Sequence, residues 1–321
     1  MVVSTSGVYG VERRYANMDL LCKSVIANGA NVLSQPDFLT GNLFYVDSNV
    51  AAAGDGSSPT EAVATIDAAV GLCTANNNDK IIVLPGHTET VSAAGGLALD
   101  VAGITLIGLG HGSDRPTITF TTVVGADMNV DAANITMVNF LFTGGIDALT
   151  GPIDVNAADF AMINCETRDV TGQATDFIVT DANANRLYID GWVHRGAAAA
   201  GADTAITIVG GDGAVIKNFW IDGNFAVAAI ENVTTAATNI SIYGDRPSFA
   251  RTRNSTDVIV TLVATATGNV GPNIYARIQD DGANITEAFV GADAQFFQPI
   301  AIVNADGESS INTNITASVD I

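Results

Sequence analysis

Positive charge is scarce in this chain, and lysine is the scarcest basic residue. The 321 residues contain 13 Lys and Arg against 34 Asp and Glu, which gives a formal net charge of −21. Only Lys23, Lys80 and Lys217 are lysines. Nucleic acids and anionic membranes are bound through basic surfaces. The composition therefore argues against both as partners, whereas it favours solubility and an attraction for divalent cations.

Cysteine and long apolar runs are also in short supply. The three cysteines, Cys22, Cys73 and Cys165, are odd in number, far apart and without a C-x-x-C spacing. We therefore expect reduced, mostly buried thiols rather than a disulfide framework or a zinc site. No segment approaches the roughly 18 consecutive apolar residues of a membrane span. The N-terminus lacks a basic segment followed by an apolar run, so we expect no secretory signal.

What the chain does contain is a repeated phrase between Leu97 and Asp245. Each copy reads as a short apolar strand, a turn rich in Asp, Asn, Ala and Gly, and a second alternating strand. The residues that open the second strands are Ile104, Ile135, Phe160, Leu187, Val215 and Ile240. The intervals between them drift and lie mostly in the twenties. A period of this length, with strands and no helices inside it, predicts the coils of a parallel β-solenoid.

The flanking segments predict a cap and two attachments. Residues 60–75 place apolar side chains on one helical face, and we interpret them as a helix that caps the exposed end of the solenoid. Residues 1–40 carry no net charge and show no strand alternation, which predicts an arm that packs on the body or holds a neighbouring molecule. The pattern changes after residue 250. We therefore predict a β-helix over 41–250 and a small antiparallel β domain over 251–321.

Three phrases resemble the first coil of the pectate-lyase-like right-handed β-helix superfamily. They are Ala64-Thr-Ile-Asp-Ala-Ala-Val, Ile81-Ile-Val-Leu-Pro-Gly-His-Thr-Glu-Thr-Val and Ile104-Thr-Leu-Ile-Gly-Leu-Gly. The resemblance implies a right-handed parallel β-helix with little other secondary structure. It selects no activity, because the superfamily includes lyases, glycosidases, epimerases, adhesins and non-enzymatic phage virion proteins. The order of arm, β-helix and small β domain is similar to phage tailspikes and to β-helical capsid decoration proteins.

The catalytic phrases of the superfamily's enzymes are incomplete in this chain. Lyases often carry Arg-x-Pro-x-x-Arg, but Arg115-Pro116 has no second arginine behind it. Glycoside hydrolysis needs two carboxylates facing one bond. The Asp-Asp phrase, Asp280-Asp281, is followed by a glycine and predicts a turn. We therefore predict no catalytic residue and keep polysaccharide lyase or glycoside hydrolase activity as the alternative.

Three other sets of side chains have both a functional and a structural interpretation. A carboxylate ladder could bind Ca²⁺, the one cofactor considered, although Asp at solenoid corners usually bonds its own backbone. Its members would be Asp100, Asp131, Asp154 and Asp181. Histidines without ligand spacing, which we expect on the surface or in turns, are His87, His111 and His194. Aromatic residues that could stack on sugars, but more often serve the core, are Tyr188, Trp192, Phe219, Trp220 and Tyr243.

These observations predict a non-enzymatic structural protein of a phage virion, and in particular a capsid decoration (cement) protein. The alternative is a receptor-binding tailspike that binds or depolymerises host polysaccharide. The expected partner is the major capsid protein or another virion protein, and the resemblance implies a homotrimer. Partner contacts are expected in the arm, through two arginines and an apolar seam. These residues are Arg13, Arg14, Tyr15, Met18, Leu21 and Val25.

Overall fold

The computed structural model describes residues 41–169, 172–198, 201–253, 258–280, 289–297, 300–305 and 308–312, and the strand residues 26–27 and 30–31. The chain divides into two compact units, residues 1–40 and residues 41–321. In the first unit, β1 (Ile26–Ala27) pairs antiparallel with β2 (Ala30–Asn31). Within the described residues, no helix is long and apolar enough to cross a membrane.

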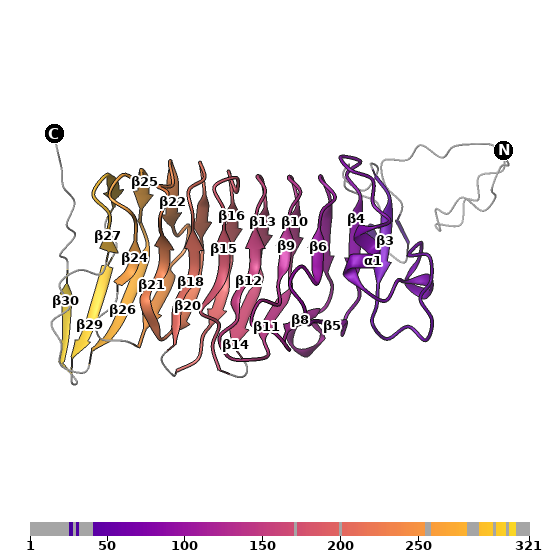
Figure 1. The fold of residues 1–321 in the computed structure, drawn as a ribbon, viewed down its shortest axis with the longest axis horizontal. Helices are drawn as coiled ribbons and strands as arrows, with labels where there is room; N and C mark the ends of the chain where they lie inside the picture. The colour runs from indigo at the N-terminus through magenta and orange to yellow at the C-terminus, as the bar shows by residue number, and fades with distance from the viewer. Residues whose placement is uncertain are drawn as a thin grey trace. The chain divides into compact units, whose positions relative to one another are not determined.

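The second unit is a solenoid whose strands form three sheets (Figure 1). Sheet 1 contains β3 (Leu43–Val46), β4 (Lys80–Val83), β7 (Thr105–Gly108), β10 (Thr136–Val138), β13 (Ala161–Ile163), β16 (Tyr188–Asp190), β19 (Val215–Lys217), β22 (Ile240–Tyr243), β25 (Gly268–Val270) and β28 (Ala294–Phe296). Sheet 2 contains β5 (Thr88–Val91), β8 (Thr117–Phe120), β11 (Leu141–Gly144), β14 (Glu166–Asp169), β17 (Val193–Arg195), β20 (Trp220–Gly223), β23 (Ser248–Thr252), β26 (Ile274–Asp280), β29 (Ile300–Ala305) and β30 (Glu308–Asn312). Sheet 3 contains β6 (Leu97–Leu99), β9 (Met128–Val130), β12 (Thr150–Val155), β15 (Asp176–Thr180), β18 (Ala202–Ile208), β21 (Phe225–Asn232), β24 (Val258–Thr261) and β27 (Phe289–Val290).

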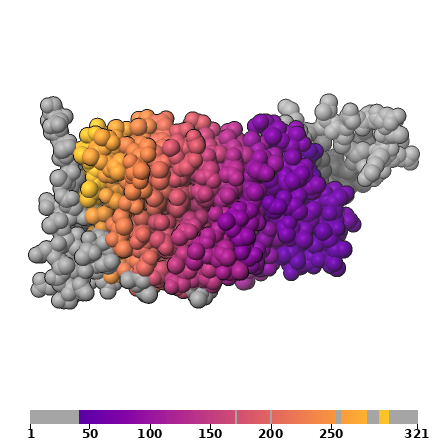
Figure 2. Space-filling view, in the orientation of Figure 1, coloured from indigo at the N-terminus to yellow at the C-terminus, as the bar shows by residue number. Residues whose placement is uncertain are grey.

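Consecutive coils stack with their strands parallel and in register, which confirms the predicted parallel β-helix and is consistent with the right-handed form. In sheet 1, for example, Leu106 pairs with Met137, which pairs with Met162. All three side chains are buried, because alternate residues of a strand point to the same side of the sheet. One apolar core runs from Val46 to Ala294. In the space-filling view the coils follow one another as adjoining bands (Figure 2).

Asparagine holds the corner between sheets 1 and 2. Asn139, Asn164 and Asn218 occupy equivalent positions with φ of 65°, 52° and 55°, a left-handed conformation that asparagine tolerates better than most residues. The Asn139 side-chain amide donates to the carbonyl oxygens of Gly108 and Gly110, at 2.8 and 2.9 Å. At this corner, Asn139 therefore satisfies backbone carbonyl groups of the previous coil.

The predicted cap is present but shorter than expected. It consists of a 3₁₀ turn, η2 (Pro59–Glu61), and of α1 (Ile66–Val70), whereas a second 3₁₀ turn, η3 (Gly112–Asp114), lies farther along the chain. Ile66, Ala69 and Val70 of α1 are buried. Asp67 of α1 accepts a hydrogen bond from the backbone amide of Ala98, on edge strand β6, at 3.3 Å. The helix therefore covers the core and also binds the first strand of sheet 3.

The predicted antiparallel domain over 251–321 is wrong for the described residues. β24 to β28 each pair in parallel with a strand of the preceding coil, so the solenoid continues. In the described part of this region, only β29 and β30 pair antiparallel. The coil length persists, because Ile240 pairs with Gly268 and Gly268 in turn pairs with Ala294. Glycine and alanine take the place of the large apolar marker, so the repeated phrase disappears while the period remains.

Candidate functional site

The outer face of sheet 2 carries three aromatic side chains in one row. Trp220, Phe249 and Tyr275 lie on β20, β23 and β26 and are register partners in consecutive coils. Their ring centroids are 6.4 Å apart for the first pair and 5.6 Å for the second. Trp220 and Phe249 remain 52% and 48% exposed. This aromatic row is an apolar stripe that the rest of the described chain leaves uncovered.

A second row on the same face is built from arginine. Arg168, Arg195, Arg251 and Arg277 occupy one register column, in which Asp222 takes the position on β20. Arg115 and Arg253 lie beside this column: Arg253 binds Asp222 of the column, whereas Arg115 binds Glu166, which is in line with Trp220. Subtracting the three lysines from the 13 basic residues leaves ten arginines, so six of the ten are on this face. We call the aromatic row, these six arginines, Glu166 and Asp222 the sheet 2 face.

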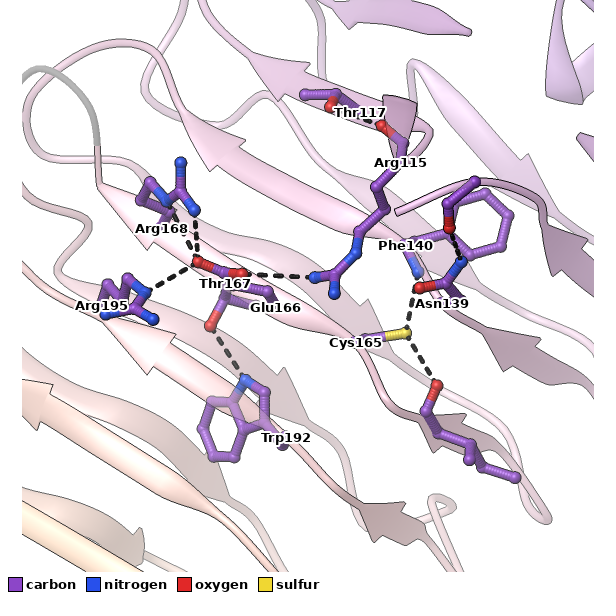
Figure 3. Close-up of polar contacts among 12 residues, drawn as sticks. Arg115, Thr117, Asn139, Phe140, Cys165, Glu166, Thr167, Arg168, Trp192 and Arg195 are labelled. Carbon is purple, nitrogen blue, oxygen red and sulfur yellow. Dashed lines mark hydrogen bonds and ion pairs between the residues drawn. The ribbon is translucent and has the colours of Figure 1, made fainter. Parts of the chain in front are cut away.

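Glu166 is the centre of an ion-pair network on this face (Figure 3). Its Oε1 accepts from Nη2 of Arg168 at 2.5 Å and from Nε of Arg195 at 2.9 Å, and its Oε2 accepts from Arg115 at 3.2 Å. Burial opposes ionisation of Glu166, but hydrogen bonds and charge from Arg168 and Arg195 outweigh it and lower its pKa. The carboxylate therefore stays ionised and shared among three cations.

Asp222 is shared in the same way between two arginines. It accepts from Arg251 at 2.8 and 2.5 Å, in the two-pronged geometry that suits a carboxylate, and from Arg253 at 2.8 Å. Arg277 is exposed and forms no ion pair among the described residues. Six arginines against two carboxylates leave a surplus of four positive charges on a chain of net charge −21.

A buried polar network lies directly beneath the sheet 2 face. The Trp192 Nε1–H donates to Thr167 Oγ1 at 2.9 Å, and the same hydroxyl is 2.8 Å from His194 Nδ1. Burial lowers the pKa of His194 to about 3. The expectation of surface or turn histidines is therefore wrong for His194 and for His87, which is also buried and accepts a hydrogen bond from the Ser48 amide. Both rings support the fold.

The outer side of sheet 3 has the opposite charge. Five carboxylates follow one another on or beside its strands, and we call them the acidic row: Asp127, Asp154, Asp176, Asp203 and Glu231. Three of them, together with Thr150, Gly151 and Val179, line an open pocket of about 210 Å³. Burial, followed by neighbouring carboxylates, raises the pKa of Asp127, Asp154, Asp203 and Glu231. The row therefore holds mutually repelling acids that a cationic partner would stabilise.

The proposed aspartate ladder for Ca²⁺ is not continuous. Backbone hydrogen bonds align Asp131, Asn156 and Asp181 in successive coils, so Asn156 takes the position expected for Asp154. The side-chain amide of Asn156 donates to Asp131 at 3.0 Å and to Asp154 at 3.3 Å. Within the described residues, no group of three or more His, Cys, Asp or Glu side chains is arranged to hold a metal ion.

The two cysteines in the described part of the chain are free thiols. Burial raises the pKa of Cys165 to about 11 and that of Cys73 to about 12. These thiols therefore stay protonated near neutral pH and behave as small apolar groups.

Asp169, at the end of β14, gives a testable pH dependence. Burial, with a further contribution from Asp147, raises its pKa to about 6, from about 3.9 in an unfolded chain. Between these two pKa values the folded state binds more protons than the unfolded state. The contribution of Asp169 to the free energy of unfolding is therefore full below pH 4 and falls as pH rises towards 6. Asp169→Asn should therefore raise the free energy of unfolding by roughly 2–3 kcal/mol at pH 7.

Urea unfolding of Asp169→Asn and wild type at pH 4 and pH 7 measures this difference. The two proteins should be close in stability at pH 4, because the wild-type carboxyl is then protonated. The asparagine oxygen can still accept the Ala174 amide hydrogen bond, which is 3.0 Å long in the wild type. An equal difference at both pH values would show that Asp169 does not titrate as described.

The arm residues predicted to contact a partner lie outside the described residues. They are Arg13, Arg14, Tyr15, Met18, Leu21 and Val25. The sheet 2 face was not predicted as a site. Its signal in the sequence is that Trp220, Phe249 and Tyr275 follow one another at the period of the coil. Of the aromatic residues considered, Trp192 and Phe219 are buried in the core, whereas Trp220 is exposed.

The similarity of this chain to known proteins is one of fold and identifies no activity. No protein-family model matches the sequence, and no curated protein matches it either. Among solved structures, the chain is similar to a rhamnogalacturonan lyase, with a TM-score of 0.44 and 14% sequence identity. The similarity covers 76% of this chain and 75% of the lyase chain.

Proposed function

We propose that this protein is a non-enzymatic structural protein of a phage virion, of the capsid decoration (cement) kind, and that the sheet 2 face is a protein-docking surface. The observation that carries the docking surface is a row of exposed aromatic rings beside a row of surplus arginines, each in register from coil to coil. Trp, Tyr, Phe and Arg are the residues enriched at protein interfaces, and Trp, Tyr and Arg dominate binding energy there. The virion assignment comes from the resemblance of the sequence to phage β-helical proteins.

The charged groups of this face are better suited to binding than to proton transfer. General acid–base catalysis needs a group that gains and loses a proton near the working pH. Glu166 instead stays ionised between three arginines, and Asp222 is bound by two. Arg195 also lies over the Trp220 ring, 5.7 Å from its centroid. These contacts preorganise the face, which lowers the entropic cost of docking.

The solenoid keeps the spacing of the face fixed. Each side chain of a row comes from a strand that is hydrogen-bonded to the strands before and after it. A partner protein that binds here must therefore present acidic groups and apolar surface at the spacing of the coils, about 4.8 Å. In a virion the partner would be the major capsid protein, another virion protein or a further copy of this chain.

Loss of particle binding in a sheet 2 face variant tests this proposal. Trp220→Ala/Phe249→Ala should reduce binding of the purified protein to particles at least about thirtyfold, since even one aromatic at an interface centre contributes about 2 kcal/mol or more. Leu72→Ala/Val124→Ala is the matched control, because both side chains are exposed apolar groups elsewhere, at 41% and 52%. Co-sedimentation with particles gives the readout. Equal binding by both variants would contradict docking through this face.

The second candidate is a tailspike that binds or depolymerises host polysaccharide, and the sheet 3 pocket favours it. Asp127, Asp154 and Asp176 line one open pocket, and burial raises the pKa of the first two. Glycoside hydrolysis uses two carboxyl groups that flank one bond, and the group that acts as the acid has a raised pKa. Robust depolymerisation of acidic or neutral polysaccharides, abolished in Asp154→Asn, would favour the tailspike over the decoration protein.

A further inference from the structure

We infer that the sheet 2 face of one copy docks on the acidic row of sheet 3 of a second copy. This inference rests on the proposed function, because it takes the sheet 2 face as a protein-docking surface and names its partner. The two surfaces have opposite charge and belong to the same chain, so every copy presents both.

Charge is the first argument for this pairing. The sheet 2 face has four more positive than negative groups, whereas the acidic row consists of five carboxylates. Complementary potentials of this kind select partners and fix their register. An arginine that approaches the acidic row also relieves the repulsion among carboxylates such as Asp154, whose neighbours include Asp127, Asp131 and Asp181.

Register is the second argument. Both surfaces run along the solenoid, one strand per coil, so they can meet over several coils only if two copies lie with parallel axes. Rotation about an axis parallel to the solenoids then brings the same coil of each copy to the same height. One coil carries Arg168 on β14 and Asp176 on β15, and the next carries Arg195 on β17 and Asp203 on β18. Two arginine–aspartate pairs are thereby aligned at once.

The aromatic row occupies the following coils of the same contact. Trp220 and Asp222 on β20 share a coil with Glu231 on β21, so Glu231 would meet the ring edge, beside an Asp222 that Arg251 and Arg253 already bind, and lie between the levels of Arg195 and Arg251. Docking would cover Trp220 and Phe249, which are about half exposed in the isolated chain. Burial of apolar surface there stabilises the contact, while the ion pairs set its register.

A contact between two different surfaces has a defined consequence for assembly. Such a heterologous interface cannot close with two copies, and it forms a ring of three or more or an open fibre. We expect the closed form and three chains. Each subunit then gives its sheet 2 face to one neighbour and its acidic row to the other.

Charge reversal on each surface separately tests the contact by light scattering of the full chain. The sheet 2 variant is Arg195→Glu/Trp220→Ala, and the sheet 3 variant is Asp203→Arg/Glu231→Lys. Arg186→Glu is the matched control, since Arg186 is exposed, pairs with Asp159 at 2.6 Å and lies in a turn outside both surfaces. Circular dichroism of each variant confirms that the solenoid is folded.

The wild type and Arg186→Glu should have the mass of three chains, and each surface variant the 32.9 kDa of one. A mixture of the two surface variants should assemble to a one-to-one dimer or larger, because one intact sheet 2 face and one intact acidic row remain and the two reversed surfaces also have opposite charge. Surface variants that stay assembled, or a mixture that stays monomeric, would overturn the inference. A monomeric wild type would also overturn the inference. If that monomer still bound particles through the sheet 2 face, the proposed function would stand. Binding of polygalacturonate by the sheet 2 face of a monomer would overturn both.

Discussion

Replacing Trp192 with alanine is expected to lower the free energy of unfolding by about 3–5 kcal/mol. Trp192 is among the largest fully buried side chains and lies in the apolar core of the solenoid. Its removal leaves a cavity between strands that are fixed by their neighbours, so the surrounding core can relax only in part. It also removes the donor that bonds Thr167, which leaves that hydroxyl with His194 alone.

The other tryptophan of the chain provides the control for this prediction. Trp220 has the same side chain but is 52% exposed on the sheet 2 face, so Trp220→Ala should cost less than about 1 kcal/mol. Urea unfolding followed by circular dichroism measures both variants against the wild type. Equal losses of stability would mean that the two tryptophans do not differ in burial as described.

Replacing Gly268 with alanine is expected to lower stability by about 3 kcal/mol or more. Gly268 begins β25 with φ of 138°, a conformation that side chains rarely adopt. A Cβ atom there would lie 2.0 Å from the carbonyl oxygen of Ile240 in the previous coil. Because both groups belong to backbone, neither can move aside without separating β22 from β25.

Gly125→Ala is the matched control for Gly268→Ala. A Cβ atom at Gly125 would meet nothing within 4 Å, so this change should leave the unfolding midpoint within error of the wild type. Limited proteolysis together with urea unfolding reports the effect, and cleavage in Gly268→Ala should begin after residue 250. A Gly268→Ala variant with unchanged stability would contradict parallel stacking of β22 on β25. It would restore the interpretation that the C-terminal region is a separate domain.

The solenoid could be predicted from the sequence because large apolar residues that point into the core recur once per coil. Ile104, Ile135, Phe160 and Leu187 are all buried at equivalent positions, as their spacing indicates. In the next coil the predicted marker, Val215, is one position away from the buried residue. Val215 pairs with Tyr188 on the outer side, and Ala214 is the buried equivalent of Leu187. Where a small residue occupies this buried position, the apolar repeat cannot be recognised in the sequence, and the same happens at Gly268.

The candidate site could not be predicted in the same way, because it is built by neighbours that are one coil apart. Trp220 and Phe249 are far apart in the chain and adjacent in space. Coil lengths here vary by several residues, since corners and β-bulges add or remove residues outside the strands. Without the register, the arginines of sheet 2 are scattered in sequence, and the low overall positive charge hides their concentration on one face.

An electron cryomicroscopy reconstruction of intact particles that carry this protein tests the proposed function most directly. We expect β-helical density on the outside of the head shell, with Trp220, Phe249 and the arginines of sheet 2 covered by protein. Density for this chain in the tail, with sheet 2 open to solvent and polysaccharide bound over Asp127 and Asp154 on sheet 3, would contradict it.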